Sequence, residues 1–320
     1  MGSQPSIWCL PKAMNQGLVD KLTLPGEDLL ASRLDRTFKS AWRSYRRAFK
    51  RCRKKLSKAT VHQLRLATRR LLALVDLFEP LLAGKAAAKF SRDFKGPFKT
   101  SGRLRDTQVL LSNVGRRLGR YPEAKRFRKE LRRRGKHFSR QLERELRRTR
   151  FKPLENQMEA LRKELRAAAE RGAGRRGVQV RLLKSVDRAF ANVVAQRRSI
   201  APTQPHATHR TRIAFKKFRY MVEQLRPLMP RLTGGSSGKL RGYQKLMGDI
   251  QDCETLLAAL DKFMREEKAE AGSLRKFRAA VKRDHARFLA RYLRRADELF
   301  SFWESRAAEP LGTSGGRRAQ

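Results

Sequence analysis

Acidic residues are scarce in this chain of 320 residues, where Asp and Glu together number 30 against 77 Lys and Arg. The formal net charge is therefore +47. Self-repulsion of this size opposes a compact state unless counterions or a bound polyanion offset it, and the surfaces of small domains ordinarily carry far less net charge. We therefore expect a polyanionic partner. Nucleic acid, an anionic membrane surface and an inorganic polyanion all fit the charge alone.

Cysteine and long apolar runs are also lacking. Cys9, Cys52 and Cys253 are odd in number, far apart and without a C-x-x-C pair, so they predict neither a disulfide framework nor a zinc site. We expect a reducing, cytoplasmic setting and no metal. No run of about 18 apolar residues occurs, so no membrane span is expected.

Strand patterns are absent, and helical periodicity runs through most of the chain. From Glu27 to about Leu56, apolar residues recur every three or four positions, which predicts an amphipathic helix. Thr60 is a candidate cap for the next helix, which carries the first motif below and should end near Pro80. Further helices are expected to begin after Gly84, with a break at 96–97, and after Asp106. The stretch 122–171 is expected to form two helices with a break at Pro153. Beyond it, helices are expected over 178–199, over the second motif as far as Pro227, and over two segments that are separated at Gly272 and end at Arg306. The fold class expected is an all-α pair of pseudo-symmetric bundles.

Proline and glycine mark the expected domain boundaries. Residues 1–26 and 307–320 are expected to be poorly ordered, and 27–306 to form one domain. Within this domain, the glycine-rich stretch "RGAGRRG" at 171–177 is the predicted linker between a first half, 27–170, and a second half, 178–306.

One cationic pattern occurs twice. "VHQLRLATRRLLALVDLFEPLL" begins at Val61, and "THRTRIAFKKFRYMVEQLRPLM" begins at Thr208, 147 positions later. The correspondence continues downstream with a shift of one residue, so we interpret the two halves as copies of one helical unit. The corresponding pairs are His62 and His209, Arg65 and Arg212, Arg69 and Lys216, Arg70 and Lys217, Lys95 and Arg241, Lys99 and Lys245, Gly102 and Gly248, and Asp106 and Asp252.

On a helix, this pattern separates charge from apolar residues. His62, Arg65 and Arg69 fall within about 60° of one another, whereas Leu71 and Leu74 fall on the opposite side. Lys95 and Lys99, like Arg241 and Lys245, add i, i+4 pairs of like charge, which destabilise an isolated helix. Repulsion repeated in both copies favours a shared polyanion site over a merely solvated face. His62 and His209 would donate to the polyanion, whose charge favours protonated imidazole.

Asp106 and Asp252 have two structural interpretations. Each could cap the start of a helix or orient a neighbouring arginine. We favour either role over catalysis.

At these residues the chain resembles the CHAD family, the conserved histidine α-helical domains. The two motif helices carry the resemblance, and the segments "GRLRDTQVL" and "GDIQDCETL" add to it, over about 27–306. The resemblance implies two helical bundles about a basic groove or pore that binds inorganic polyphosphate, and association with polyphosphate granules. The polyphosphate-binding candidates are His62, Arg65, Arg69, Arg70, Lys95, Lys99, Arg105, His209, Arg212, Lys216, Lys217, Arg219, Arg241 and Lys245. The first copy has Leu72 and Ala73 where the second has Arg219 and Tyr220, so the halves should bind unequally.

Two alternatives remain open. A nucleic-acid binder would also use the total charge, including the basic run 116–150, but no groove-reading motif is legible, and most aromatics fall in apolar helical patterns. Tyr220 would be the stacking residue to test. An enzyme acting on polyphosphate would need a carboxylate array. The nearest match, "ERELR" from Glu143, puts Glu143 and Glu145 on different faces of a helix, so we expect no catalytic residues.

Overall fold

The computed structural model describes residues 27–82, 84–170, 174–199, 205–229, 236–267 and 272–303, with the side chains of 27–29, 95–98, 174–176 and 205–207 left out. The expected disordered segments, 1–26 and 307–320, lie outside these ranges. Over the described ranges every regular element is a helix, so the all-α fold class is confirmed. Within them, no helix combines the length and the apolar character needed to cross a bilayer.

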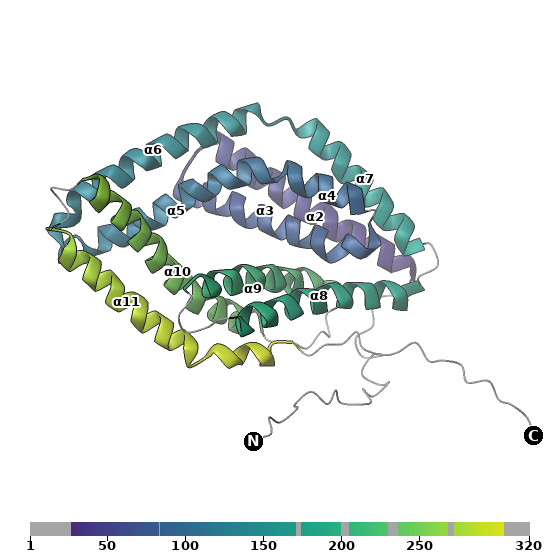
Figure 1. Cartoon of the computed structure of the whole chain (residues 1–320). Helices are drawn as coiled ribbons and strands as arrows, with labels where there is room; N and C mark the ends of the chain where they lie inside the picture. The colour runs from purple at the N-terminus through teal and green to yellow at the C-terminus, as the bar shows by residue number, and fades with distance from the viewer. Residues whose placement is uncertain are drawn as a thin grey trace, which may run out of the picture.

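The helices follow one another with short connections (Figure 1). The α-helices are α2 (Glu27–Lys54), α3 (Lys58–Phe78), α4 (Gly84–Asp93), α5 (Lys95–Arg117), α6 (Lys125–Arg148), α7 (Phe151–Glu170), α8 (Gly174–Arg198), α9 (Pro205–Leu225), α10 (Ser237–Glu266) and α11 (Arg275–Leu293). Short 3₁₀ helices are η1 (Glu79–Leu81), η2 (Pro122–Ala124) and η4 (Ala296–Ser301).

Five boundary predictions are wrong. The break expected at 96–97 falls at Phe94, and the break expected at Pro153 falls at 149–150, so that Pro153 lies in the first turn of α7, where a proline needs no backbone N–H. Ser57, not Thr60, is the N-cap of α3, and Thr60 completes a capping box from the third helical position. Asp106 does not precede the start of a helix, because it lies in the middle of α5. Helix α8 begins at Gly174, so the second half of the expected linker is helical, and residues 171–173 lie outside the described ranges.

The duplication seen in the sequence extends to helix bounds. Helices α3 and α9 both have 21 residues, and α9 begins 147 positions after α3. Helix α8 also begins 147 positions after α2. The order α2, α3, α5, α6 in the first half thus corresponds to α8, α9, α10, α11 in the second.

The apolar core does not follow the boundary between the copies. One cluster joins Phe38 and Leu74 from the first half to Phe215 and Tyr243 from the second. A smaller cluster joins the α5–α6 pair to the α10–α11 pair, which meet at the left of Figure 1. The expected division into two bundles is therefore not confirmed, because both clusters draw buried side chains from both copies.

Candidate functional site

Helices α3 and α9 pack against each other, and each also packs against its downstream partner, α5 or α10. This arrangement brings cations of both copies together. We call them the central cationic cluster: His62, Arg65 and Arg69 from α3, Arg105 from α5, and Arg212 and Lys216 from α9.

Arg65 is the most enclosed member of the central cationic cluster. Its side chain is buried, with 8% exposure, and Nη1 donates to Ser101 Oγ at 3.3 Å. Burial, and then the charge of Arg69, lower the pKa of Arg65 to about 10. Gly102 makes room for the guanidinium, because a Cβ built there would lie 3.0 Å from Arg65 Nη1. The small residue pair 101–102 on α5 thus fixes the position of this arginine.

Lys216 is the member whose charge is most perturbed. Its side chain is half-buried. Burial, and then the charges of Arg69, Arg212 and Arg65, together lower the pKa of Lys216 to about 6. A lysine in this state is mostly neutral at pH 7, because burial and the surrounding cations both disfavour its charged form.

Arg212 has nearby acids but incomplete hydrogen bonding. Among the described residues, its buried Nε has no hydrogen-bond partner. Burial lowers the pKa of Arg212, and Asp252 and Asp106 oppose that shift. Both aspartates lie inside helices, α5 and α10, so the capping interpretation is wrong for both. The charge-partner interpretation fits, since each lies close enough to act on a clustered arginine.

The two motif histidines differ in environment. His62 is exposed, and its pKa is lowered by burial of the ring and then by the charges of Arg105 and Arg69. His209 is half-buried, and its Nδ1 is hydrogen-bonded to Oε1 of Gln251 on α10. His62 is therefore the histidine more available to a ligand.

Arg219 is predicted to bind the ligand, but the structure gives it protein partners instead. Its buried guanidinium donates to Gln244 Oε1 at 2.8 Å and to Glu223 Oε1. It also stacks over the ring of Tyr220, 4.2 Å from the ring centroid. Arg219 thus positions its neighbours, and little of it is left for a polyanion.

Several other candidates lie away from the central cationic cluster. Lys217 forms an ion pair with Asp76 on α3 at 3.0 Å, and exposed Lys245 forms one with Asp249 in its own helix at 2.7 Å. Lys99 faces a hollow between α5 and α6. The side chain of Lys95 lies outside those described.

Arg70 and Arg241 line a separate groove, which we call the α2 groove, with a volume of about 1040 Å³. Four further arginines line it from α2, and the sequence interpretation missed them. Their signal was legible, because Arg33, Arg36, Arg47 and Arg51 share one face at helical spacing.

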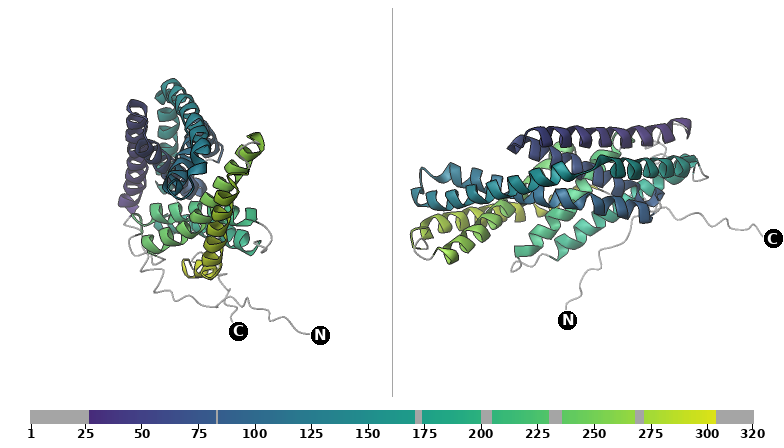
Figure 2. Two further views of the ribbon diagram at one scale, coloured as in Figure 1. Left: turned by 90° about the vertical axis from the view of Figure 1, so that its left-hand side faces the viewer. Right: turned by 90° about the horizontal axis from the view of Figure 1, so that it is seen from above.

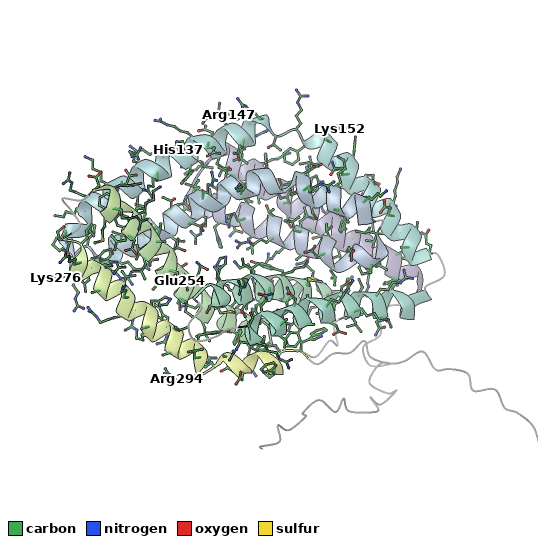
Figure 3. All side chains as sticks on the ribbon, viewed as in Figure 1. His137, Arg147, Lys152, Glu254, Lys276 and Arg294 are labelled. Carbon is green, nitrogen blue, oxygen red and sulfur yellow. The ribbon has the colours of Figure 1, made fainter. Side chains whose placement is uncertain are left out.

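Part of the basic run 116–150 lines a hollow of its own. The described residues that line this hollow all belong to α6, and among them are His137 and Arg147, which Figure 3 labels. None of its lining residues belongs to the central cationic cluster.

The carboxylates considered for catalysis point to different partners. Glu143 forms an ion pair with Arg147 at 2.7 Å, whereas Glu145 accepts a hydrogen bond from Thr100 at 2.7 Å. The described residues contain no group of His, Cys, Asp and Glu that could hold a metal ion. The absence of catalysis stays a prediction.

Comparisons with known proteins agree with the helical arrangement. A family model, the CHAD domain, matches residues 36–261. The fold is similar to the crystal structure of the CHAD domain from the plant Ricinus communis, with a TM-score of 0.59, 17% identity, and coverage of 85% of this chain and 89% of that one. It is also similar to PptA from Streptomyces chartreusis, with a TM-score of 0.54, 16% identity, and coverage of 85% and 99%. No curated protein matches the chain in sequence.

Proposed function

Because the chain belongs to the CHAD family, we propose that it binds inorganic polyphosphate through the central cationic cluster, that it does not catalyse a reaction, and that binding places it in the cytoplasm on polyphosphate granules. Polyphosphate is a linear polyanion with charge on every unit and no bases. Guanidinium and ammonium groups recognise such a chain through charge-assisted hydrogen bonds.

The burial of Lys216 among arginines carries this proposal. Burial lowers its pKa most, and Arg65, Arg69 and Arg212 lie close enough to lower it as well, to about 6 in all. Bringing like charges together in a partly buried site is unfavourable by itself. A bound phosphate chain would supply the missing negative charge and accept hydrogen bonds, including one from the unpartnered Nε of Arg212.

Nucleic acid remains the alternative ligand, but the aromatic residue singled out for stacking does not suit it. Tyr220 is buried, with 5% exposure, beneath Arg219. Base stacking on aromatics contributes roughly 1–3 kcal/mol per base in proteins that bind single strands, and Tyr220 cannot make that contact. Nucleic acid would have to bind through phosphate contacts alone.

Competition between the two polyanions tests the proposal. We expect long-chain polyphosphate to displace labelled RNA from the full chain at ~150 mM salt, at equal phosphate concentration, while RNA displaces labelled polyphosphate poorly. Both affinities should fall as salt rises, because counterions are released on binding. Equal displacement in both directions would contradict the proposal and indicate a general polyanion binder. Phosphate release with added Mg²⁺ would contradict its non-catalytic part.

The paired glycines of α5 and α10 give a matched mutational test. Gly102→Ala is expected to push Arg65 aside, because the new Cβ would lie 3.0 Å from its Nη1, and to lower polyphosphate affinity several-fold. Gly248→Ala, at the corresponding position, meets no atom within 4 Å and should leave affinity unchanged. In a helix, the alanine at 248 should also stabilise the protein by up to about 1 kcal/mol. Titration calorimetry and urea unfolding measure both effects, and equal affinities for the two variants would contradict the role of Arg65.

A further inference from the structure

Two grooves outside the central cationic cluster correspond to each other through the repeat. The α2 groove lies between α2, the first half of α3 and the ends of α9 and α10. A second groove, of about 670 Å³, lies between α8, α4, the end of α3 and the middle of α9; we call it the α8 groove. Arg70 and Glu223 line the first groove where Lys217 and Asp76, their counterparts, line the second. The two grooves are therefore two versions of one structural position.

Their charges differ sharply. The α8 groove contains three cations and two acids, and its acids are paired: Asp76 with Lys217 at 3.0 Å, and Glu79 with Arg188 at 3.6 Å. The described lining of the α2 groove contains six arginines and one acid, Glu223. In the part of the chain that the structure describes, no ion pair joins any of these six arginines to a carboxylate. The arginines are Arg33, Arg36, Arg47, Arg51, Arg70 and Arg241.

One substitution between the copies explains why Glu223 leaves Arg70 unpaired. In the α8 groove, Lys217 pairs with Asp76, and the residue four positions before Asp76 is Leu72. On α9 the corresponding residue is Arg219, which is buried beside the α2 groove and donates to Glu223. Arg219 thus takes the carboxylate that would otherwise face Arg70. The α2 groove retains its positive charge as a result.

The lining of the α2 groove suits a phosphate chain better than a base-bearing ligand. Ser40, Ala41 and Ser44 lie between the two pairs of arginines along α2, so small side chains line the stretch between the charged ones. None of the described residues that line the groove is aromatic, so these residues offer no surface for base stacking. Helix α2 runs along one outer side of the molecule, where a chain can reach it (Figure 2).

We propose that the α2 groove is a second binding site for condensed phosphate, separate from the central cationic cluster. The corresponding α8 groove does not bind this ligand. The inference rests on the proposed function for its ligand class. The six arginines of the α2 groove supply forked donors for phosphate oxygens along the groove. The Arg219–Glu223 pair, with one residue near each site, joins the two sites within the fold.

Inorganic tripolyphosphate tests this proposal, because a short anion can be counted at each site separately, whereas one long polyphosphate chain could contact both sites. Titration calorimetry of the full chain at ~150 mM salt should show two anions bound per protein. The triple variant Arg36→Gln, Arg47→Gln, Arg51→Gln should lose one of them. A matched variant with the same loss of charge on the same helix, Arg43→Gln, Lys50→Gln, Arg53→Gln, should keep both, because these exposed residues do not line the groove.

The outcomes separate the two proposals. Loss of one anion from the groove variant, but not from the matched variant, supports the second site. Equal tripolyphosphate binding by the two triple variants overturns the second site. The second site also fails if the wild type binds a single tripolyphosphate and the double variant Arg69→Gln, Lys216→Gln abolishes that binding. In the last case the central site stands and only the second site fails. No binding of tripolyphosphate or long-chain polyphosphate to the wild type overturns the proposed function itself.

Discussion

Replacing Arg69 and Lys216 together by glutamine is expected to lower the affinity for long-chain polyphosphate by roughly 100-fold, since a hydrogen bond to a charged group contributes about 1.5–3 kcal/mol and each 1.4 kcal/mol is tenfold. Both residues belong to the central cationic cluster, one from each copy of the repeat. Direct binding at ~150 mM salt measures the effect.

The matched control removes the same charge elsewhere. The double variant Lys129→Gln, Lys276→Gln removes two exposed cations, one near the start of α6 and one near the start of α11. Figure 3 labels Lys276. This variant should lose no more than a few-fold in affinity. The cluster variant should not unfold more easily than the wild type, because it relieves repulsion among partly buried cations. Equal losses in both variants would show that total charge alone drives binding.

Polyphosphate binding at pH 7 is expected to take up close to one proton. The pKa of Lys216 in the free protein is about 6, below its ordinary value, so about a tenth of the molecules carry the charge at pH 7. A bound polyanion raises that pKa, and protonation follows binding. The pKa of His62 is also lowered in the free protein, so it adds a smaller share in the same direction.

The sign of the pH dependence follows from this uptake. Affinity should rise as pH falls from about 8 toward 6, by at most about tenfold per unit, and level off below the free-state pKa of about 6, where Lys216 is already charged. Calorimetry in buffers with different ionisation enthalpies counts the protons. Lys216→Met should abolish most of the uptake while His62 keeps its share. An affinity that stays constant between pH 6 and 8 would contradict the assignment.

The sequence predicts the helices and the members of the central cationic cluster for a simple reason. Apolar periodicity identifies the buried face of α3, where Leu71 and Leu74 are indeed buried, and the repeat identifies which cations correspond. Asp106 misled the boundary prediction because a residue suited to capping also tolerates a helix interior when it faces an arginine. Side-chain spacing alone does not distinguish a capping aspartate from one that lies inside a helix beside an arginine.

The remaining errors concern contacts across helices. Arg219 belongs to the same pattern as the binding candidates, yet Gln244 and Glu223 occupy its donors. Arg70 and Lys217 occupy equivalent positions, and only the contacts around them show that one is paired and the other is not. The arginines of α2 lie outside the repeated motif, so nothing in the pattern joined them to Arg70 before the fold placed them together.

The shared core makes the duplication itself a requirement for folding. Phe127 and Phe277, like Leu256 and Leu110, meet in one cluster, and α3 packs on α9 across the boundary between the copies. A single copy would therefore expose the surface that the other copy covers. It could bury that surface only against a second identical chain, in a two-fold arrangement where each patch meets its own equivalent. In that homodimer the two peripheral grooves would be identical by symmetry, and their present inequality requires both copies to be encoded in one polypeptide.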